Sequence, residues 1–368
     1  MRDVLAAVLR KLRGVSIAGF VCHSLCLCTL AAPAALAGCA QSLRLTRLSA
    51  AARPPSNIAV FFAVDDARGE PIADLLANDF RIYEDGKLVS VDESQQTIVN
   101  PEIAAAHYTL LLVDTSASVN ASDQLAAISG AAREFLTSLE RYQRVGVYAF
   151  DGSKSLYEIV PFTQTGPQAL AGLERLSSFE TKDPSTNLNG AVLAALSELD
   201  KVVRRSDAPL HFGTLVVFTD GTDRANRVPY QQMIDAVEAS PHNVYTLGVG
   251  LETDDSSLAR IGKAGYIRVE ESSASSSAFQ EIAERILRQT RRYYLLSYCS
   301  PARAGKHTVT IEAVTAGRHG QLEYPFDANG FGPRCNPTQP PAFDTTGRSR
   351  KLQHKLVDGA RADQTMSR

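Results

Sequence analysis

The hydrophobic positions of this chain fall into two patterns, and each pattern predicts a different kind of element. Short apolar runs have the length of buried strands at residues 108–113, 145–150, 214–219, 243–249 and 266–269. Segments between them repeat apolar residues every three or four positions, which predicts helices at residues 122–141, 188–204, 230–239, 256–263 and 275–290. Strands that alternate with helices are typical of a doubly wound, mostly parallel sheet. We therefore expect an α/β domain over residues 106–292.

The two flanks of this domain have strand patterns instead. Upstream, residues 58–64 and 79–84 predict strands, and Asp85-Gly86 predicts a tight hairpin turn into residues 87–91. Downstream, residues 292–298 and 307–314 also predict strands. So few strands on either side cannot bury a core alone. We expect one β-sandwich built from residues 57–100 and 293–336, with the α/β domain inserted between them.

The N-terminus has the pattern of a targeting segment over residues 1–38, with basic residues before an apolar stretch at 15–35. Leu36-Ala37-Gly38-Cys39 resembles a bacterial lipobox, which implies cleavage before Cys39 and acylation of that residue. Ala40 favours the outer membrane over the inner one. An ordinary cleavage site and an uncleaved signal anchor are the alternatives. We expect a tether at residues 39–56, a disordered tail at 337–368, and no further membrane-spanning segment.

Cysteine usage agrees with export. Of the six cysteines, three lie in the targeting segment and Cys39 is the expected lipid site. Cys299 and Cys335 remain, without the C-x-x-C spacing of a metal or redox site. In an oxidising compartment this even pair predicts a structural disulfide, with a reactive thiol as the alternative.

Candidate metal ligands follow two of the predicted strands. Asp114, Ser116 and Ser118 come after the strand at 108–113, and Asp220 comes after the strand at 214–219. Thr186 lies in a polar loop before a predicted helix. The carboxyl ends of parallel strands meet at one edge of a sheet, and hard oxygen ligands bind Mg²⁺, Mn²⁺ or Ca²⁺. The alternative is that Asp114 and Ser118 only cap the next helix. We interpret the nearby Asp223 as a solvated loop carboxylate.

This constellation resembles the von Willebrand factor A domain and its metal-ion-dependent adhesion site, whose pattern is D-x-S-x-S, then a loop Thr, then T-D-G. The resemblance covers residues 108–292. It implies that Ser116 and Ser118 ligate the ion through their hydroxyls, joined by Thr186 or a carboxylate. Asp114 and Asp220 would act partly through bound water and through hydrogen bonds to the other ligands. One coordination position would then accept an Asp or Glu side chain of a partner protein. Since both carboxylates are expected at the surface, their removal should leave the fold intact.

The upstream flank resembles the corresponding segment of a group of exported bacterial proteins that contain this domain. The matching positions are Asp66, Gly69, Pro71, Leu75, Asp79, Phe80, Glu84, Asp85 and Gly86.

Enzymatic chemistry finds little support in the sequence. There is no G-x-S-x-G, no G-x-x-x-x-G-K-[ST] and no H-E-x-x-H motif. His107 and His211 precede sheet strands and so belong at the edge opposite the metal.

A net charge of −2 and the absence of a basic aromatic stripe argue against nucleic acid binding. We expect a lipid-anchored, metal-dependent protein-binding module. The alternatives are a structural module with a non-functional metal site and a metal-assisted hydrolase.

Overall fold

The structure is a computed structural model that describes residues 42–90, 97–99, 105–120, 124–163, 165–206, 208, 210–250, 254–270 and 274–338. The expected targeting segment, Cys39 and residues 339–368 of the expected tail lie outside these residues. Among the described residues, no helix has both the length and the hydrophobicity that a membrane crossing requires.

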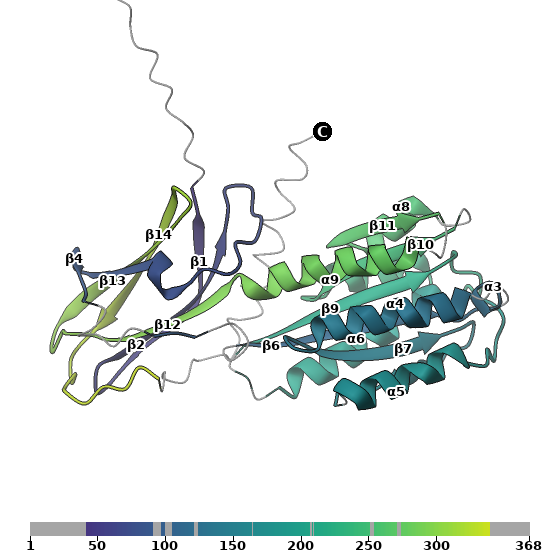
Figure 1. Ribbon diagram of the computed structural model, residues 1–368, viewed down its shortest axis with the longest axis horizontal. Helices are drawn as coiled ribbons and strands as arrows, with labels where there is room; N and C mark the ends of the chain where they lie inside the picture. The colour runs from purple at the N-terminus through teal and green to yellow at the C-terminus, as the bar shows by residue number, and fades with distance from the viewer. Residues whose placement is uncertain are drawn as a thin grey trace, which may run out of the picture. The chain divides into compact units, whose positions relative to one another are not determined.

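A six-stranded sheet with strand order β11-β10-β9-β6-β7-β8 forms the centre of the α/β part (Figure 1). All neighbours are parallel except β7 and β8, which are antiparallel. The strands are β6 (Ala105–Asp114), β7 (Arg144–Phe150), β8 (Tyr157–Val160), β9 (Leu210–Thr219), β10 (Asn243–Val249) and β11 (Gly265–Val269). The predicted fold class, an α/β domain with a mostly parallel sheet, is confirmed.

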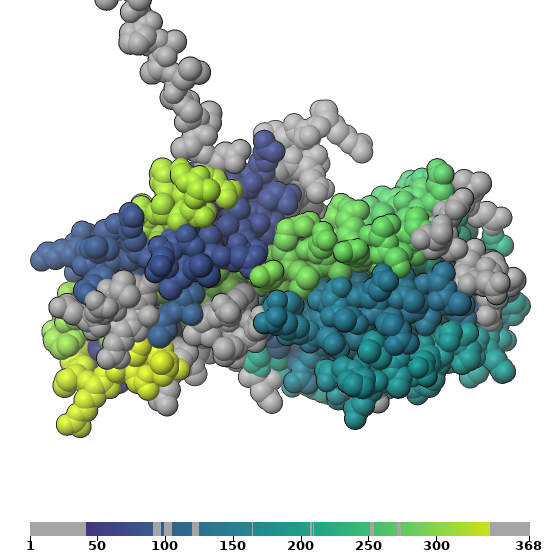
Figure 2. All heavy atoms as spheres, viewed as in Figure 1, coloured from purple at the N-terminus to yellow at the C-terminus, as the bar shows by residue number. Residues whose placement is uncertain are grey.

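Helices cover both faces of this sheet. One hydrophobic core joins the sheet to α4 (Gln124–Leu139), α5 (Gly166–Ser177) and α9 (Ser275–Arg291). These three helices lie side by side on their face (Figure 1, Figure 2). A second core joins the opposite face to α6 (Leu188–Arg204), α7 (Tyr230–Ala239) and α8 (Asp255–Ile261). Both cores are needed because the strands are apolar on both faces.

The flanks form two four-stranded sheets that share a hydrophobic core. The first has the order β1-β2-β12-β5, with strands β1 (Arg44–Arg53), β2 (Asn57–Asp65), β12 (Tyr293–Cys299) and β5 (Thr97–Val99). The second has the order β14-β13-β3-β4, with strands β14 (Arg318–Asp327), β13 (Lys306–Thr315), β3 (Phe80–Glu84) and β4 (Lys87–Leu88). Each sheet therefore combines strands from before and after the α/β part.

Three elements correct the sequence-based expectations. The expected tether contains β1, which pairs antiparallel with β2 from Arg44 to Arg53, because this pairing completes the backbone hydrogen bonds of a buried strand. The largely polar β14 pairs with all of β13 and buries Leu322 and Phe326. The first helix of the α/β part begins earlier than expected, with α3 (Ala117–Asn120) ahead of α4.

The last helix passes directly into the first flank sheet. Arg292 alone separates α9 from β12, and its guanidinium Nη1 lies 2.7 Å from the Asp65 carboxylate on β2. Beside this buried ion pair, the Tyr293 ring stacks on Phe212 with centroids 4.6 Å apart, and Phe212 stacks on His107 at 5.1 Å. Strand starts of the α/β sheet therefore pack against the flank sheet.

A disulfide joins Cys299 to Cys335, with an S–S distance of 2.04 Å and Cα atoms 5.7 Å apart. The predicted pairing is confirmed. The bridge closes a segment that contains β13 and β14, since the two cysteines are 36 positions apart.

Replacing both cysteines with alanine should lower the free energy of unfolding by roughly 3–4 kcal/mol, because the unfolded chain then regains the entropy of an open loop. Urea unfolding of the Cys299→Ala/Cys335→Ala variant measures this loss, and adding a reducing agent to the unaltered chain is the matched control. Equal midpoints in all three samples would show that the bridge contributes no stability.

Candidate metal centre

The two candidate carboxylates lie at the carboxyl ends of neighbouring parallel strands. Asp114 is the last residue of β6, and Asp220 directly follows β9. The position of Asp114 is fixed by strand pairing on both sides, since β6 lies between β9 and β7. The edge expected from the sequence is therefore where both residues lie.

Asp114 is completely buried, and both of its carboxylate oxygens accept hydrogen bonds. Oδ1 accepts from the Ser116 backbone N–H at 2.9 Å, and Oδ2 accepts from the Thr219 hydroxyl at 2.7 Å. Burial, followed by repulsion from Asp220, raises the pKa of Asp114 to about 7. The expectation of a surface carboxylate was wrong for Asp114, because the residue ends a strand that is buried at every position from His107 onward.

The hydroxyls of the D-x-S-x-S segment converge. Ser116 is buried and Ser118 is exposed, and their Oγ atoms lie 3.3 Å apart. Adjacent ligands of an octahedral Mg²⁺ ion, each about 2.1 Å from the metal, are about 3.0 Å apart. The two serines therefore fit neighbouring positions around one small divalent cation.

Thr186 is buried, and its loop contacts both carboxylate-bearing segments. The backbone N–H of Ala117 donates to Pro184 in this loop at 3.1 Å. The backbone N–H groups of Arg224 and Ala225, which follow Asp220, both donate to the Thr186 carbonyl at 2.9 Å. Backbone hydrogen bonds thus join all three parts of the sequence motif at one end of the sheet.

Asp151 is a residue of the site that the sequence interpretation missed. It is buried and accepts hydrogen bonds from the backbone N–H groups of Ser153, Lys182 and Asp183 at 2.8, 2.9 and 3.2 Å. Burial alone would raise the pKa of Asp151, but these hydrogen bonds hold it below its usual value. The signal was present, since Asp151 follows the predicted strand at 145–150 just as Asp114 follows its own strand.

Arg227 fixes the same loop from the other side. Its Nε donates to the Gly152 carbonyl at 2.6 Å, and its Nη2 lies 2.9 Å from the Asp183 carboxylate. One guanidinium therefore connects the segment after β7 with the segment that carries Thr186.

Asp223 is more than a solvated carboxylate, which corrects the expectation for this residue. Its Oδ1 accepts from the Asn189 backbone N–H in the first turn of α6, and its Oδ2 accepts from the Asn226 N–H, both at 3.0 Å. A carboxylate that accepts hydrogen bonds at a helix N-terminus stabilises that helix. Asp223 thereby orients the start of α6, which begins two residues after Thr186.

The site depends on hydroxyls more than on charged ligands. In the part of the chain that the structure describes, no group of three or more His, Cys, Asp or Glu residues could hold a metal ion. His107 and His211 lie near the starts of β6 and β9, at the opposite edge of the sheet. Burial lowers the pKa of His107 to about 3, so this side chain is neutral at physiological pH.

Replacing Asp114 with asparagine should stabilise the metal-free protein at neutral pH. Burial raises the pKa of Asp114 from 3.8 in the unfolded chain to about 7 in the folded protein. The free energy of unfolding therefore falls as the pH rises between these values, because the carboxyl must then ionise in a buried position. The asparagine cannot ionise and keeps an acceptor for the Ser116 N–H, so its advantage should reach roughly 2–4 kcal/mol above pH 7.

Urea unfolding in chelator from pH 4 to pH 8 measures this difference, and Asp235→Asn, at an exposed position of α7, is the control. The interpretation is wrong if the difference between Asp114→Asn and the unaltered chain does not grow with pH.

Replacing Arg227 with methionine should weaken Mn²⁺ binding by about 10-fold, because groups that orient metal ligands commonly contribute 10–100-fold to affinity. The methionine retains an apolar stem but neither of the two hydrogen bonds. Calorimetric titration compares it with Arg288→Met on α9, whose partner Glu284 is 4.0 Å away at an exposed site. Unchanged affinity in Arg227→Met would show that this guanidinium does not organise the site.

Comparison with known proteins found a matching family model and similar solved structures. The family model of the von Willebrand factor type A domain matches residues 109–222. Similar solved structures include a von Willebrand factor type A protein from Catenulispora acidiphila, at 12% identity over 79% of this chain and 75% of that chain, with a TM-score of 0.43. The ArnB paralog VWA2 from Sulfolobus acidocaldarius is similar at 12% identity over 78% of this chain and 74% of that chain, with a TM-score of 0.40.

Manganese-loaded TRAP protein from Plasmodium vivax is similar at 13% identity over 64% of this chain and 98% of that chain, with a TM-score of 0.42. A comparison with curated proteins gave no match. The matched residues contain most of β6 and all of β7, α6 and β9, and these three strands lie next to one another in the six-stranded sheet. The α/β part of this chain therefore has the fold of a von Willebrand factor type A domain.

Proposed function

We propose that this protein is a divalent-metal-dependent protein-binding module. The ion, Mg²⁺ or alternatively Mn²⁺ or Ca²⁺, would be held by the hydroxyls of Ser116, Ser118 and Thr186. Asp220 would act partly through bound water, and Asp114 through its hydrogen bonds to the serine segment and to Thr219. The observation that carries the proposal is the pair of serine oxygens 3.3 Å apart beside a buried carboxylate. When bound, the ion supplies an electrophilic coordination position that attracts the carboxylate of a partner's Asp or Glu.

The hydrogen bonds of Asp114 explain why this residue would not neutralise the ion by direct contact. Both oxygens already accept hydrogen bonds, from Ser116 and from Thr219, and the side chain is closed to solvent. Asp114 therefore holds the serine segment in place and contributes negative charge from behind it. Neutral hydroxyls then face the ion, which leaves more of its charge for a foreign carboxylate.

Binding without chemical turnover fits the groups around the site. Asp151 is occupied by three backbone N–H donors, and hydrogen bonds with Ser185 and Arg227 lower the pKa of Asp183. Carboxylates with lowered pKa values are poor general bases near neutral pH. The histidines of the sheet lie at its other edge, far from the hydroxyls.

We also propose that the protein is exported and anchored through lipid on Cys39, in the outer membrane of a bacterial envelope. The lipobox-like sequence supports the anchor. The Cys299–Cys335 disulfide supports an oxidising compartment, because such bonds persist mainly outside the cytosol.

Partner recovery from envelope extract should depend on the metal and on the hydroxyls. The full chain on beads should retain a partner in Mg²⁺ and release it in chelator. The Ser116→Ala variant should retain at least about 10-fold less partner, because loss of a ligand weakens binding of the ion. Ser177→Ala, which removes an exposed hydroxyl on α5, is the matched control.

Mn²⁺ binding measured by electron paramagnetic resonance accompanies each sample. Recovery that is equal in Mg²⁺, in chelator and with Ser116→Ala would contradict metal-dependent recognition. Failure of the unaltered chain to bind Mn²⁺ would contradict the metal site itself.

A further inference from the structure

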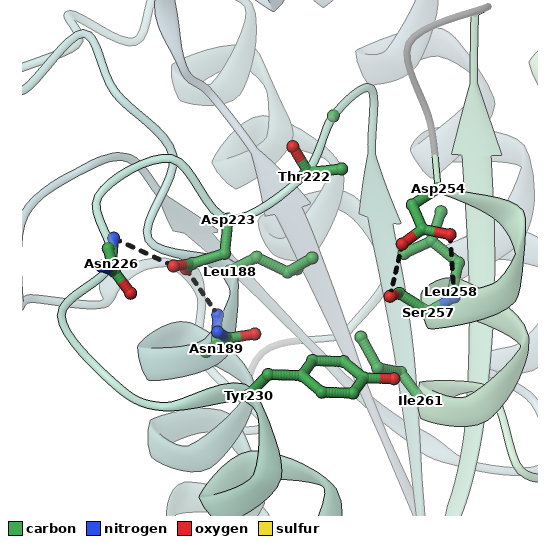
Figure 3. Close-up of a pocket in the computed structure, with 11 residues that line it drawn as sticks. Leu188, Asn189, Thr222, Asp223, Asn226, Tyr230, Asp254, Ser257, Leu258 and Ile261 are labelled. Atoms are coloured by element: carbon green, nitrogen blue, oxygen red, sulfur yellow. Dashed lines mark hydrogen bonds between the residues drawn. The ribbon is translucent and has the colours of Figure 1, made fainter.

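A pocket of about 280 Å³ lies beside the candidate metal centre (Figure 3). One wall is formed by Gly221, Thr222 and Asp223, which directly follow Asp220. Another wall contains Leu188 and Asn189, which begin α6 two residues after Thr186. The pocket therefore shares two backbone segments with the metal centre, so a partner that reaches one is placed close to the other.

The floor of this pocket is apolar. Leu188, Leu258 and Ile261 are at most 3% exposed. In the view of Figure 3 the ring of Tyr230 lies below Leu188, with its hydroxyl beside Ile261. These side chains come from the first turns of α6 and α7 and from α8. A floor of this kind contacts methylene groups well and offers little to a fully polar ligand.

The rim of the pocket is negatively charged. Asp223 and Asp254 lie on opposite sides of it, with Leu188 between them (Figure 3). Hydrogen bonds from Ser257 and Ser256 lower the pKa of Asp254 to about 2, so it is ionised throughout the neutral range. Among the described residues that line the pocket, none is Lys or Arg. Arg260 stands over the Tyr230 ring at 5.7 Å but does not line the pocket.

We propose that this pocket binds a basic side chain, Arg or Lys, from the same partner segment whose Asp or Glu reaches the metal. The inference rests on the proposed function, which it deepens by naming a second feature of the partner. A basic side chain has an apolar stem that matches the floor and a cationic head that matches the two rim carboxylates. A purely apolar side chain would desolvate Asp223 and Asp254 without compensation.

A matched pair of small probes tests the charge preference. Methyl resonances of Leu188, Leu258 and Ile261 are followed in the full chain, in chelator, during titration with n-butylguanidinium or with n-butylurea. The two probes have the same shape, and only the first carries a charge. We expect the cation to shift these methyl groups and to bind at least about 5-fold more tightly than the neutral probe.

The carboxylates are tested by Asp223→Asn combined with Asp254→Asn. Asparagine keeps an oxygen acceptor for the backbone N–H groups at α6 and α8, so the helix starts are preserved while both charges are removed. The double variant should lose the preference for the cation, whereas Glu238→Gln, at an exposed position of α7, should retain it. Equal affinity for both probes, or an unchanged preference in the double variant, would overturn the pocket assignment.

The link to the partner is tested with the same variants on beads in Mg²⁺. Recovery of the partner should fall at least about 5-fold in the double variant relative to Glu238→Gln, with Mn²⁺ affinity measured in each sample. Unchanged recovery would overturn the claim that metal and pocket serve one partner. Because the probe titrations are done in chelator, loss of Mn²⁺ binding contradicts the proposed function without affecting the result for the pocket.

Discussion

The buried carboxylate of Asp114 is the constraint on which the rest of the metal centre depends. An ionised carboxylate closed to solvent is unfavourable unless hydrogen bonds or a cation compensate it. Two hydrogen bonds do so in part, and the raised pKa of about 7 shows that they do not compensate burial and the charge of Asp220 completely. A divalent cation beside the two serine hydroxyls would supply the missing positive charge. In the proposed metal site, the ion would thus offset a destabilising charge that the metal-free protein leaves only partly compensated.

That organisation comes from backbone contacts among segments far apart in sequence. The Thr186 loop receives N–H donors from the segment after Asp220 and supplies a carbonyl to Ala117. Asp151 accepts a hydrogen bond from the Lys182 N–H at the start of this loop, and Arg227 joins Asp183 of the loop to Gly152. Ligand hydroxyls held by such contacts lose little conformational entropy when an ion binds. At the other edge of the sheet, the buried Arg292–Asp65 pair and the Phe212–Tyr293 stack join the α/β part to the flank strands.

Sequence reasoning succeeded where one local pattern determines the structure. The strands at 108–113 and 214–219 are mostly apolar, so the position of Asp114 and Asp220 at one sheet edge follows from the fold class. It failed where an element forms only because it contacts a segment distant in the sequence. Strand β1 has no clear apolar alternation and forms because it pairs with the edge of β2. The sequence did not predict α5 or β8. The burial of Asp114 and the pocket lined from three helices were not visible, because both depend on packing between segments that no single stretch encodes.

The position of a bound ion is the most direct test of this account. A crystal of the full chain grown with Mn²⁺ and measured at a wavelength where manganese scatters anomalously would locate it. The account predicts one anomalous peak within bonding distance of the Ser116 and Ser118 hydroxyls, with Asp114 retaining its hydrogen bonds to Ser116 and Thr219. A fully loaded crystal with its peak elsewhere, for example between Asp151 and Asp183, or with direct Mn²⁺ coordination by Asp114 in place of the serines, would contradict it.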